Sequence, residues 1–222
     1  MSQLNYLAKS VFIIYGAIVS QSSHANNTFE LSLNIGSPII DGDLSDSIWQ
    51  STPNYRGLTQ IWPIIKDTHN YETKTKITRD KHNLYVAMDI SAENYPIVAN
   101  TLKHRGDISG DDRVTVYIDS QNSGQNAYWF EVNANGVKND GLLVNNSNNI
   151  EEWDGVWQAH TRQNAQGWAV EIAIPFSLLS FNATGNEWGI NIVQHVESKQ
   201  VQLRASNLSQ MSNILILNIL IK

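Results

Sequence analysis

The sequence predicts an all-β protein, an antiparallel β-sandwich of the jelly-roll type, and two observations carry this prediction. Apolar and polar residues alternate in many short segments between residues 74 and 193, and Gly, Asn, Asp and Ser separate the segments. Alternation with a period of two is typical of strands that bury one face, and these turn residues reverse the chain between strands. No long segment has a helical period, so a sandwich is favoured over an α/β fold.

Residues 112–141 give the clearest pair of strands. The segment alternates, breaks at a turn around Gly124, alternates again and breaks at Asn135-Gly136. The residues expected to face the core are Val114, Val116, Ile118, Tyr128, Phe130 and Val132. Those expected on the opposite face are Thr115, Tyr117, Asp119, Trp129, Glu131 and Asn133. An open face that carries an indole beside a carboxylate and an amide has the chemistry of a sugar-binding surface.

Before this pair, the sequence indicates a first strand, a helical turn and a hairpin. Residues 29–33 alternate as a strand does. Ser45 can cap a short helical turn ending near Trp49, whose indole is expected to close one end of the core. Residues 74–90 alternate on both sides of a polar turn, with an inner row of Leu84, Val86, Met88 and Ile90. Residues 92–111 are expected to form a long loop.

After the pair, four more strands are expected, at 142–144, 156–161, 167–175 and 189–193. In the third of these, Glu171 is expected to face outward as a solubilising residue, and Pro175 ends the strand. The inward row there is Trp168, Val170, Ile172 and Ile174.

The composition limits the class of protein. A chain of 222 residues with 41% hydrophobic residues can bury one ordinary core. The net charge of −6 and the scattered basic residues argue against a nucleic-acid partner, which needs clustered Lys and Arg. The chain has no cysteine, so no disulfide stabilises it.

Three regions are expected along the chain. Residues 1–25 have the pattern of a secretory signal peptide, because Lys9 precedes an apolar run and small residues end at Ala25. The apolar run is too short to span a membrane, so we expect export to the periplasm, the cell envelope or the medium. Residues 26–199 form the sandwich. The apolar tail, residues 200–222, fits either a final strand or a truncated end, with truncation slightly favoured.

Trp129 and Trp153 are the candidate sugar-stacking residues. An aromatic ring can stack on the apolar face of a sugar, while nearby amides and carboxylates bond its hydroxyls. Glu131, Asn133 and Asn135 are the candidate hydroxyl partners. The alternative for both indoles is ordinary packing in the core.

Asp107, Asp111 and Asp112 are candidate ligands for a calcium ion, because calcium prefers oxygen ligands from loops. Their spacing matches no regular calcium loop, and turn carboxylates are the favoured alternative. A glycoside hydrolase would need two carboxylates at a fixed separation, and no such pair is evident.

Several segments together resemble one known family, the family 9 carbohydrate-binding module-like domain. The similar segments are IIDGDLSDSIW, SGDDRVTVYIDSQNSGQNAYWFEVNANGVKNDG, EEWDGVW, GWAVEIAIPFSLL and WGINIV, within residues 37–193. The form that the chain is most similar to precedes an outer-membrane β-barrel in exported envelope proteins. The resemblance implies a jelly-roll sandwich that binds sugars, often beside glycan-degrading enzymes such as xylanases.

The sequence departs from this family at the sugar clamp. Sugar-binding members hold the saccharide between two tryptophans, and Ile108-Ser109-Gly110 stands where the first is expected. Thr115 stands at a position where the family has Glu. The favoured interpretation is a non-catalytic carbohydrate-binding module for polysaccharide degradation or uptake at the envelope. The alternatives are an interaction or plug domain of an outer-membrane barrel without a sugar site and, less favoured, a glycoside hydrolase.

Overall fold

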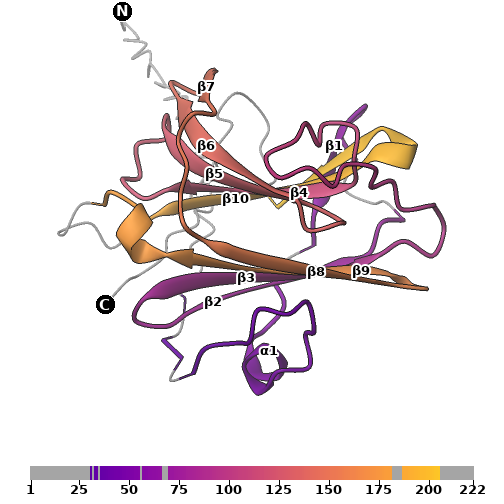
Figure 1. Cartoon of the computed structure of the whole chain (residues 1–222), viewed down its shortest axis with the longest axis horizontal. Coiled ribbons are helices and arrows are strands. Elements are labelled where there is room, and N and C mark those ends of the chain that lie inside the picture. Colours follow the sequence, from indigo (N-terminus) through magenta and orange to yellow (C-terminus); the bar gives the residue numbers. More distant parts are fainter. Residues whose placement is uncertain are drawn as a thin grey trace, which may run out of the picture.

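Two antiparallel sheets pack face to face in the computed structural model, which describes residues 31, 33–34, 36–55, 57–66, 70–181 and 187–205 (Figure 1). The seven-stranded sheet has the order β1-β11-β10-β4-β5-β6-β7, and the four-stranded sheet has the order β2-β3-β9-β8. The strands are β1 (Thr59–Trp62), β2 (Thr73–Arg79), β3 (Asn83–Ser91), β4 (Arg113–Asp119), β5 (Ala127–Asn133), β6 (Lys138–Val144), β7 (Asn148–Ile150), β8 (Gln158–Asn164), β9 (Gly167–Pro175), β10 (Gly189–Val196) and β11 (Val201–Arg204). The predicted all-β sandwich is confirmed.

Helices are few and short in the described residues. They are α1 (Ser47–Ser51), η1 (Phe176–Leu178) and η2 (Glu197–Lys199). The part of the chain that the structure describes has no helix that is long and apolar enough to cross a membrane. Residues 92–111 contain no strand or helix and form the predicted long loop, which we call the 92–111 loop.

The core lies between the two sheets and contains the rows that alternation predicts. From the larger sheet it takes Val114, Val116, Ile118, Phe130 and Val132, and from the smaller sheet Leu84, Val86, Met88, Ile90, Trp168, Val170, Ile172 and Ile174. These side chains are almost fully buried. Burial of each such side chain stabilises the fold by about 1.5–3 kcal/mol. The alternate residues of β4 and β5 therefore point to the outer face of the larger sheet.

Glu171 faces outward from β9 as predicted, but it is not a solvated residue. It is fully buried beneath residues 41–49, and α1 lies outside the four-stranded sheet (Figure 1). Its carboxylate accepts bonds from Nε1 of Trp49 at 2.6 Å and from the backbone N–H groups of Asp41 at 2.9 Å and Gly42 at 2.7 Å.

Trp49 also differs from its prediction. It does not close the end of the core but packs on the outside of the smaller sheet, against Tyr85, Ala87 and Ala173. The helix cap is Asp46 rather than Ser45, and it makes no side-chain capping bond.

Two strands were not expected from the sequence, β1 and β7, and β11 lies in the tail for which a final strand was one of two alternatives. β11 lies beyond residue 199, the expected end of the sandwich, and pairs with both β1 and β10. Of the expected first strand, Leu33 forms an isolated bridge with Arg79, and residues 29–30 lie outside the described residues. The expected signal peptide, residues 1–25, and residues 206–222 of the tail also lie outside them.

Candidate functional site

A hollow of about 860 Å³ lies on the outer face of the seven-stranded sheet, over β4, β5 and β6. Its floor consists of outward side chains of the strands: Arg113, Thr115, Tyr117, Trp129, Glu131, Asn139, Leu143 and Asn149. Residues 105–109 of the 92–111 loop form one wall, and Asp140 and Glu151 complete the lining. The alternation that fills the core with one row of β4 and β5 places the other row in this hollow.

Two aromatic rings lie side by side on this floor. Tyr117 of β4 is directly opposite Trp129 of β5, and Gly141 of β6 is opposite Trp129 on its other side. A Cβ atom built on Gly141 would lie 2.5 Å from Cζ2 of Trp129, so the indole rests against the backbone of β6. Trp129 is 8% exposed, and its indole N–H has no hydrogen-bond partner among the described residues.

A carboxylate lies next to these rings. Glu131 is opposite Thr115, and its Oε1 atom accepts bonds of 2.9 Å from the Thr115 hydroxyl and from Nε of Arg113. Burial raises the pKa of Glu131, and the charge of Arg113 opposes this effect. Burial and the charge of Glu131 also raise the pKa of Tyr117, so its hydroxyl is neutral at physiological pH. The floor therefore combines apolar ring surface with fixed donors and acceptors.

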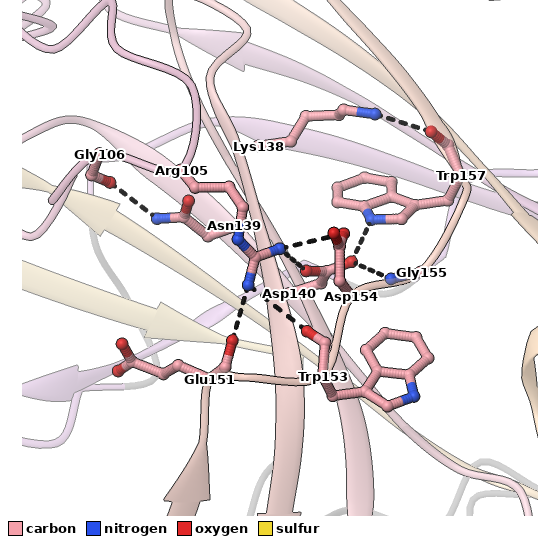
Figure 2. A network of polar contacts seen from close by, with 10 residues as sticks. All are labelled: Arg105, Gly106, Lys138, Asn139, Asp140, Glu151, Trp153, Asp154, Gly155 and Trp157. Carbon is pink, nitrogen blue, oxygen red and sulfur yellow. Dashed lines mark hydrogen bonds and ion pairs between the residues drawn. The ribbon is translucent and has the colours of Figure 1, made fainter.

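Arg105 fastens the 92–111 loop to the rest of the site (Figure 2). Its guanidinium forms an ion pair with Asp140 of β6 and donates to the carbonyl groups of Glu151 at 2.6 Å and Trp153 at 3.4 Å. The guanidinium also lies 3.3 Å from the exposed carboxylate of Asp154. One cation thus joins the loop, a strand and the segment between β7 and β8.

Asp140 is the buried centre of this network. In addition to Arg105, its Oδ2 atom accepts bonds from the backbone N–H of Gly155 at 2.9 Å and from Nε1 of Trp157 at 2.8 Å. The neighbouring Asn139 donates to the carbonyl of Gly106 at 3.0 Å. These bonds hold the wall of the hollow at a fixed place above the sheet.

Of the sequence-predicted residues, Trp129 and Glu131 lie together in the hollow, but Trp153 does not. The ring of Trp153 packs edge-on against Tyr128 at 5.2 Å and Phe130 at 5.8 Å between centroids. Phe130 faces the core, so Trp153 lies on the opposite side of β5 from Trp129. Figure 2 shows its indole directed away from the Arg105 guanidinium. The two indoles therefore do not form one platform.

Asn133 and Asn135 hold the loop rather than line the hollow. Asn133 is fully buried and donates to Asp111 at 2.8 Å and to the carbonyl of Thr101 at 3.0 Å. Asn135 donates to the carbonyl of Ala99 at 2.8 Å. Both amides are occupied by the 92–111 loop.

The three aspartates considered for calcium bond to separate backbone groups. Asp107 accepts from the N–H of Ser109, and Asp111 accepts from the N–H of Asn100 at 2.8 Å. Asp112 accepts from the N–H of Glu197 at 2.6 Å, and burial raises its pKa to about 6. Within the described ranges, no three His, Cys, Asp or Glu side chains are grouped as metal ligands.

Tyr117 and Arg113 are two of the residues of the hollow that sequence reasoning did not nominate as sugar contacts. The alternation of β4 places both on the same face as Thr115, so the pattern already contained this signal. Alternation does not show which residues of β5 lie beside them. That depends on the register of the hairpin, in which Tyr117 is opposite Trp129 and Thr115 is opposite Glu131.

A family model described as "Carbohydrate family 9 binding domain-like" matches residues 40–210. The chain belongs to this family. The match covers the described sandwich from the segment before α1 to beyond β11. A comparison with curated proteins finds no match.

Solved structures of this carbohydrate-binding module family have the same fold. Two describe a family 9 carbohydrate-binding module from Caldicellulosiruptor kristjanssonii. The cellotriose complex is 19% identical, with a TM-score of 0.60 over 86% of this chain and 92% of the module. The glucose complex is also 19% identical, with a TM-score of 0.61 over 88% of this chain and 95% of the module. A Bacteroides uniformis protein is 13% identical, with a TM-score of 0.65 over 87% and 99% of the two chains.

Proposed function

We propose that this domain is a non-catalytic module that binds a saccharide in the hollow on the outer face of the seven-stranded sheet. The observation that carries the proposal is the pair of rings, Tyr117 and Trp129, set beside Glu131 and Arg113 in one hollow. Flat rings offer apolar area to the C–H face of a sugar, and the charged pair offers bonds to its hydroxyls. Membership of the family supports the same function.

The state of the buried carboxylates supports binding rather than hydrolysis. Glu131 is bonded to Arg113 and Thr115, and Asp140 is bonded to Arg105, Gly155 and Trp157. A general acid needs a carboxyl that is free to release a proton to the substrate. These two carboxylates instead have fixed partners, which suits the orientation of a ligand.

The affinity should be modest. Each hydrogen bond to a sugar hydroxyl replaces a bond to water, so its net contribution is about 1 kcal/mol. A few such bonds with one stacked ring correspond to dissociation constants on the order of micromolar to millimolar.

Titration calorimetry with glucose, cellotriose and xylo-oligosaccharides tests the proposal. Tyr117→Ala and Trp129→Ala should each abolish the binding that the unmodified protein shows. Trp62→Ala is the matched control, because Trp62 is 57% exposed at the end of β1, four strands away from β5. Absence of binding to every sugar, or equal loss in all three variants, would contradict the proposal.

We also propose that the protein is exported and binds polysaccharides, such as xylan, at the cell envelope, where it serves their degradation or uptake. The support is the pattern of residues 1–25, in which Lys9 precedes an apolar run and Ala25 ends a group of small residues. Mature protein that begins at Asn26 in the periplasmic or extracellular fraction would agree with this proposal. Protein that keeps residues 1–25 in the cytoplasm would oppose it.

A further inference from the structure

Arg204 is a cation on the same outer face as the hollow. Its neighbour Leu203 is fully buried in the core, so alternation turns Arg204 outward from β11. Arg204 pairs with Val193 of β10, and Val193 pairs with Thr115 of β4. The backbone of Arg204 therefore lies two strand spacings, roughly 10 Å, from the Thr115 position at the floor of the hollow. An arginine side chain can cover much of that distance.

Arg204 differs from Arg105, Arg113 and Arg162 in having no acidic partner among the described residues. Arg105, Arg113 and Arg162 each form an ion pair with a carboxylate. No ion pair of Arg204 exists among the described residues, and its buried Nε atom has no hydrogen-bond partner there. A cation that is taken out of water without a counter-charge destabilises the fold. Such a residue is expected where a ligand supplies the opposite charge.

Among the described residues, the side chains around Arg204 do not supply that charge. The outward residues that pair near Arg204 on β1, β10 and β11 are uncharged or basic: Thr59, Trp62, Asn191, Val193, His195 and Gln202. Glu131, in the same transverse row, bonds to Arg113 and Thr115. Asp119 also faces outward, but its carboxylate accepts the N–H of Gly124 at 2.6 Å and the Ser123 hydroxyl at 3.1 Å.

The charge of the Arg204 guanidinium influences two neighbouring groups, and one of them, Tyr117, belongs to the floor of the hollow. This charge acts on the hydroxyl of Tyr117 and opposes the rise in the pKa of that group. Burial, Arg113 and Arg204 together lower the pKa of His195 to about 3. His195 is therefore neutral at physiological pH.

We propose that Arg204 binds an oxyanion on the saccharide, so that the ligand of the hollow is an acidic sugar such as a uronate. The inference rests on the proposed function and names its ligand class. The planar fork of a guanidinium matches a carboxylate or a sulfate ester with two parallel hydrogen bonds. Tyr117 and Trp129 would hold the ring of the sugar while Arg204 holds its charged substituent.

Calorimetry with matched oligosaccharides tests this assignment. The probes are xylotetraose, xylotetraose with one glucuronosyl substituent, and sulfated xylotetraose. The full chain should bind at least one acidic form about tenfold more tightly than xylotetraose, as one charge-assisted bond implies. The acidic probe that binds with the higher affinity shows whether the oxyanion is a carboxylate or a sulfate ester. Arg204→Gln should remove the preference and leave xylotetraose binding unchanged, whereas Arg204→Lys should keep part of it.

Arg162→Gln is the matched control because it removes the same charge from an exposed site on β8, where Arg162 pairs with Asp43. It should keep the full preference. Binding of xylotetraose without any preference for an acidic form would overturn the inference and leave the proposed function standing. An equal loss of preference in Arg162→Gln would also overturn it. Absence of binding to all three probes would overturn the inference, and absence of binding to glucose and cellotriose as well would remove the proposed function.

Discussion

The indole of Trp129 rests against Gly141, the residue opposite it on the neighbouring strand β6. A Cβ atom at Gly141 would come within 2.5 Å of both the indole and the carbonyl oxygen of Ile150. Contacts this short cannot be kept, so a side chain at Gly141 would have to displace the ring or the β6–β7 pair. The absence of a side chain at Gly141 therefore determines how closely the indole of Trp129 approaches the backbone of β6.

Gly141→Ala should accordingly lower stability by about 1–3 kcal/mol, the usual range for overpacking, and should abolish sugar binding. Urea denaturation and calorimetry measure the two effects. Gly57→Ala is the control, since a Cβ atom there has no neighbour within 4 Å. Unchanged binding in Gly141→Ala would show that the position of the indole is not what the ligand requires.

Arg105→Ala should destabilise the protein by about 2 kcal/mol, because the buried carboxylate of Asp140 loses its cation but keeps the donors of Gly155 and Trp157. The wall of the hollow would loosen, so sugar binding should weaken as well. Asp154→Ala removes the exposed partner of the same arginine, at 72% side-chain exposure, and should change stability by less than about 0.5 kcal/mol. Thermal unfolding of both variants separates the two contacts. An equal loss of stability in the two variants would contradict the conclusion that Asp140 is the main partner of Arg105.

Trp153→Ala should lower stability without removing the ligand site. The substitution deletes edge-on contacts with Tyr128 and Phe130 and leaves a gap at the margin of the core, which costs about 2 kcal/mol for a partly buried ring. Binding measured well below the melting temperature should equal that of the unmodified protein. A folded Trp153→Ala variant that binds no sugar would restore Trp153 as a stacking residue.

Asp112 should make the protein less stable as the pH rises from about 4 to about 6. Burial raises its pKa from 3.8 to about 6, so the unfolded chain releases this proton at a lower pH than the folded protein. The stabilising effect of the bound proton is complete below the unfolded pKa and is lost as the pH passes the folded pKa.

Asp112→Asn should remove this contribution. The comparison is the difference in unfolding free energy between the variant and the unmodified protein, because other carboxyl groups titrate in the same range. Asp80 is one of these: although burial opposes it, bonds from His82, Tyr85 and Asn83 lower its pKa to about 2, so its effect has the opposite sign. A difference that stays constant across this pH range would contradict the assignment.

The two-residue period was sufficient to predict which side of each central strand is buried. Phe130 faces the core and Trp129 and Glu131 face the hollow because adjacent residues of a strand must point to opposite sides. The same rule placed Tyr117 on the outer face. It could not show which residues of other strands would be its neighbours, since these depend on register.

Residues in loops and residues covered by distant segments could not be placed in this way. The direction of Trp153 depends on Arg105, a residue far away in sequence that holds the carbonyl groups around it. Glu171 alternates outward as predicted, yet Asp41, Gly42 and Trp49 cover it from more than a hundred positions away. Periodicity describes one strand and contains no information about what folds over it.

The cover over Glu171 has a consequence for how the domain tolerates sequence change. Because residues 41–49 seal the outside of β3 and β9, Tyr85, Ala87 and Ala173 are enclosed on the side that would otherwise meet water. Charged replacements at the enclosed positions Tyr85, Ala87 and Ala173 should therefore be rejected, whereas β8, whose residues are largely exposed, should accept them. New binding surfaces could then arise more readily on the outer face of the larger sheet, where the hollow lies, than on the covered face of the smaller one.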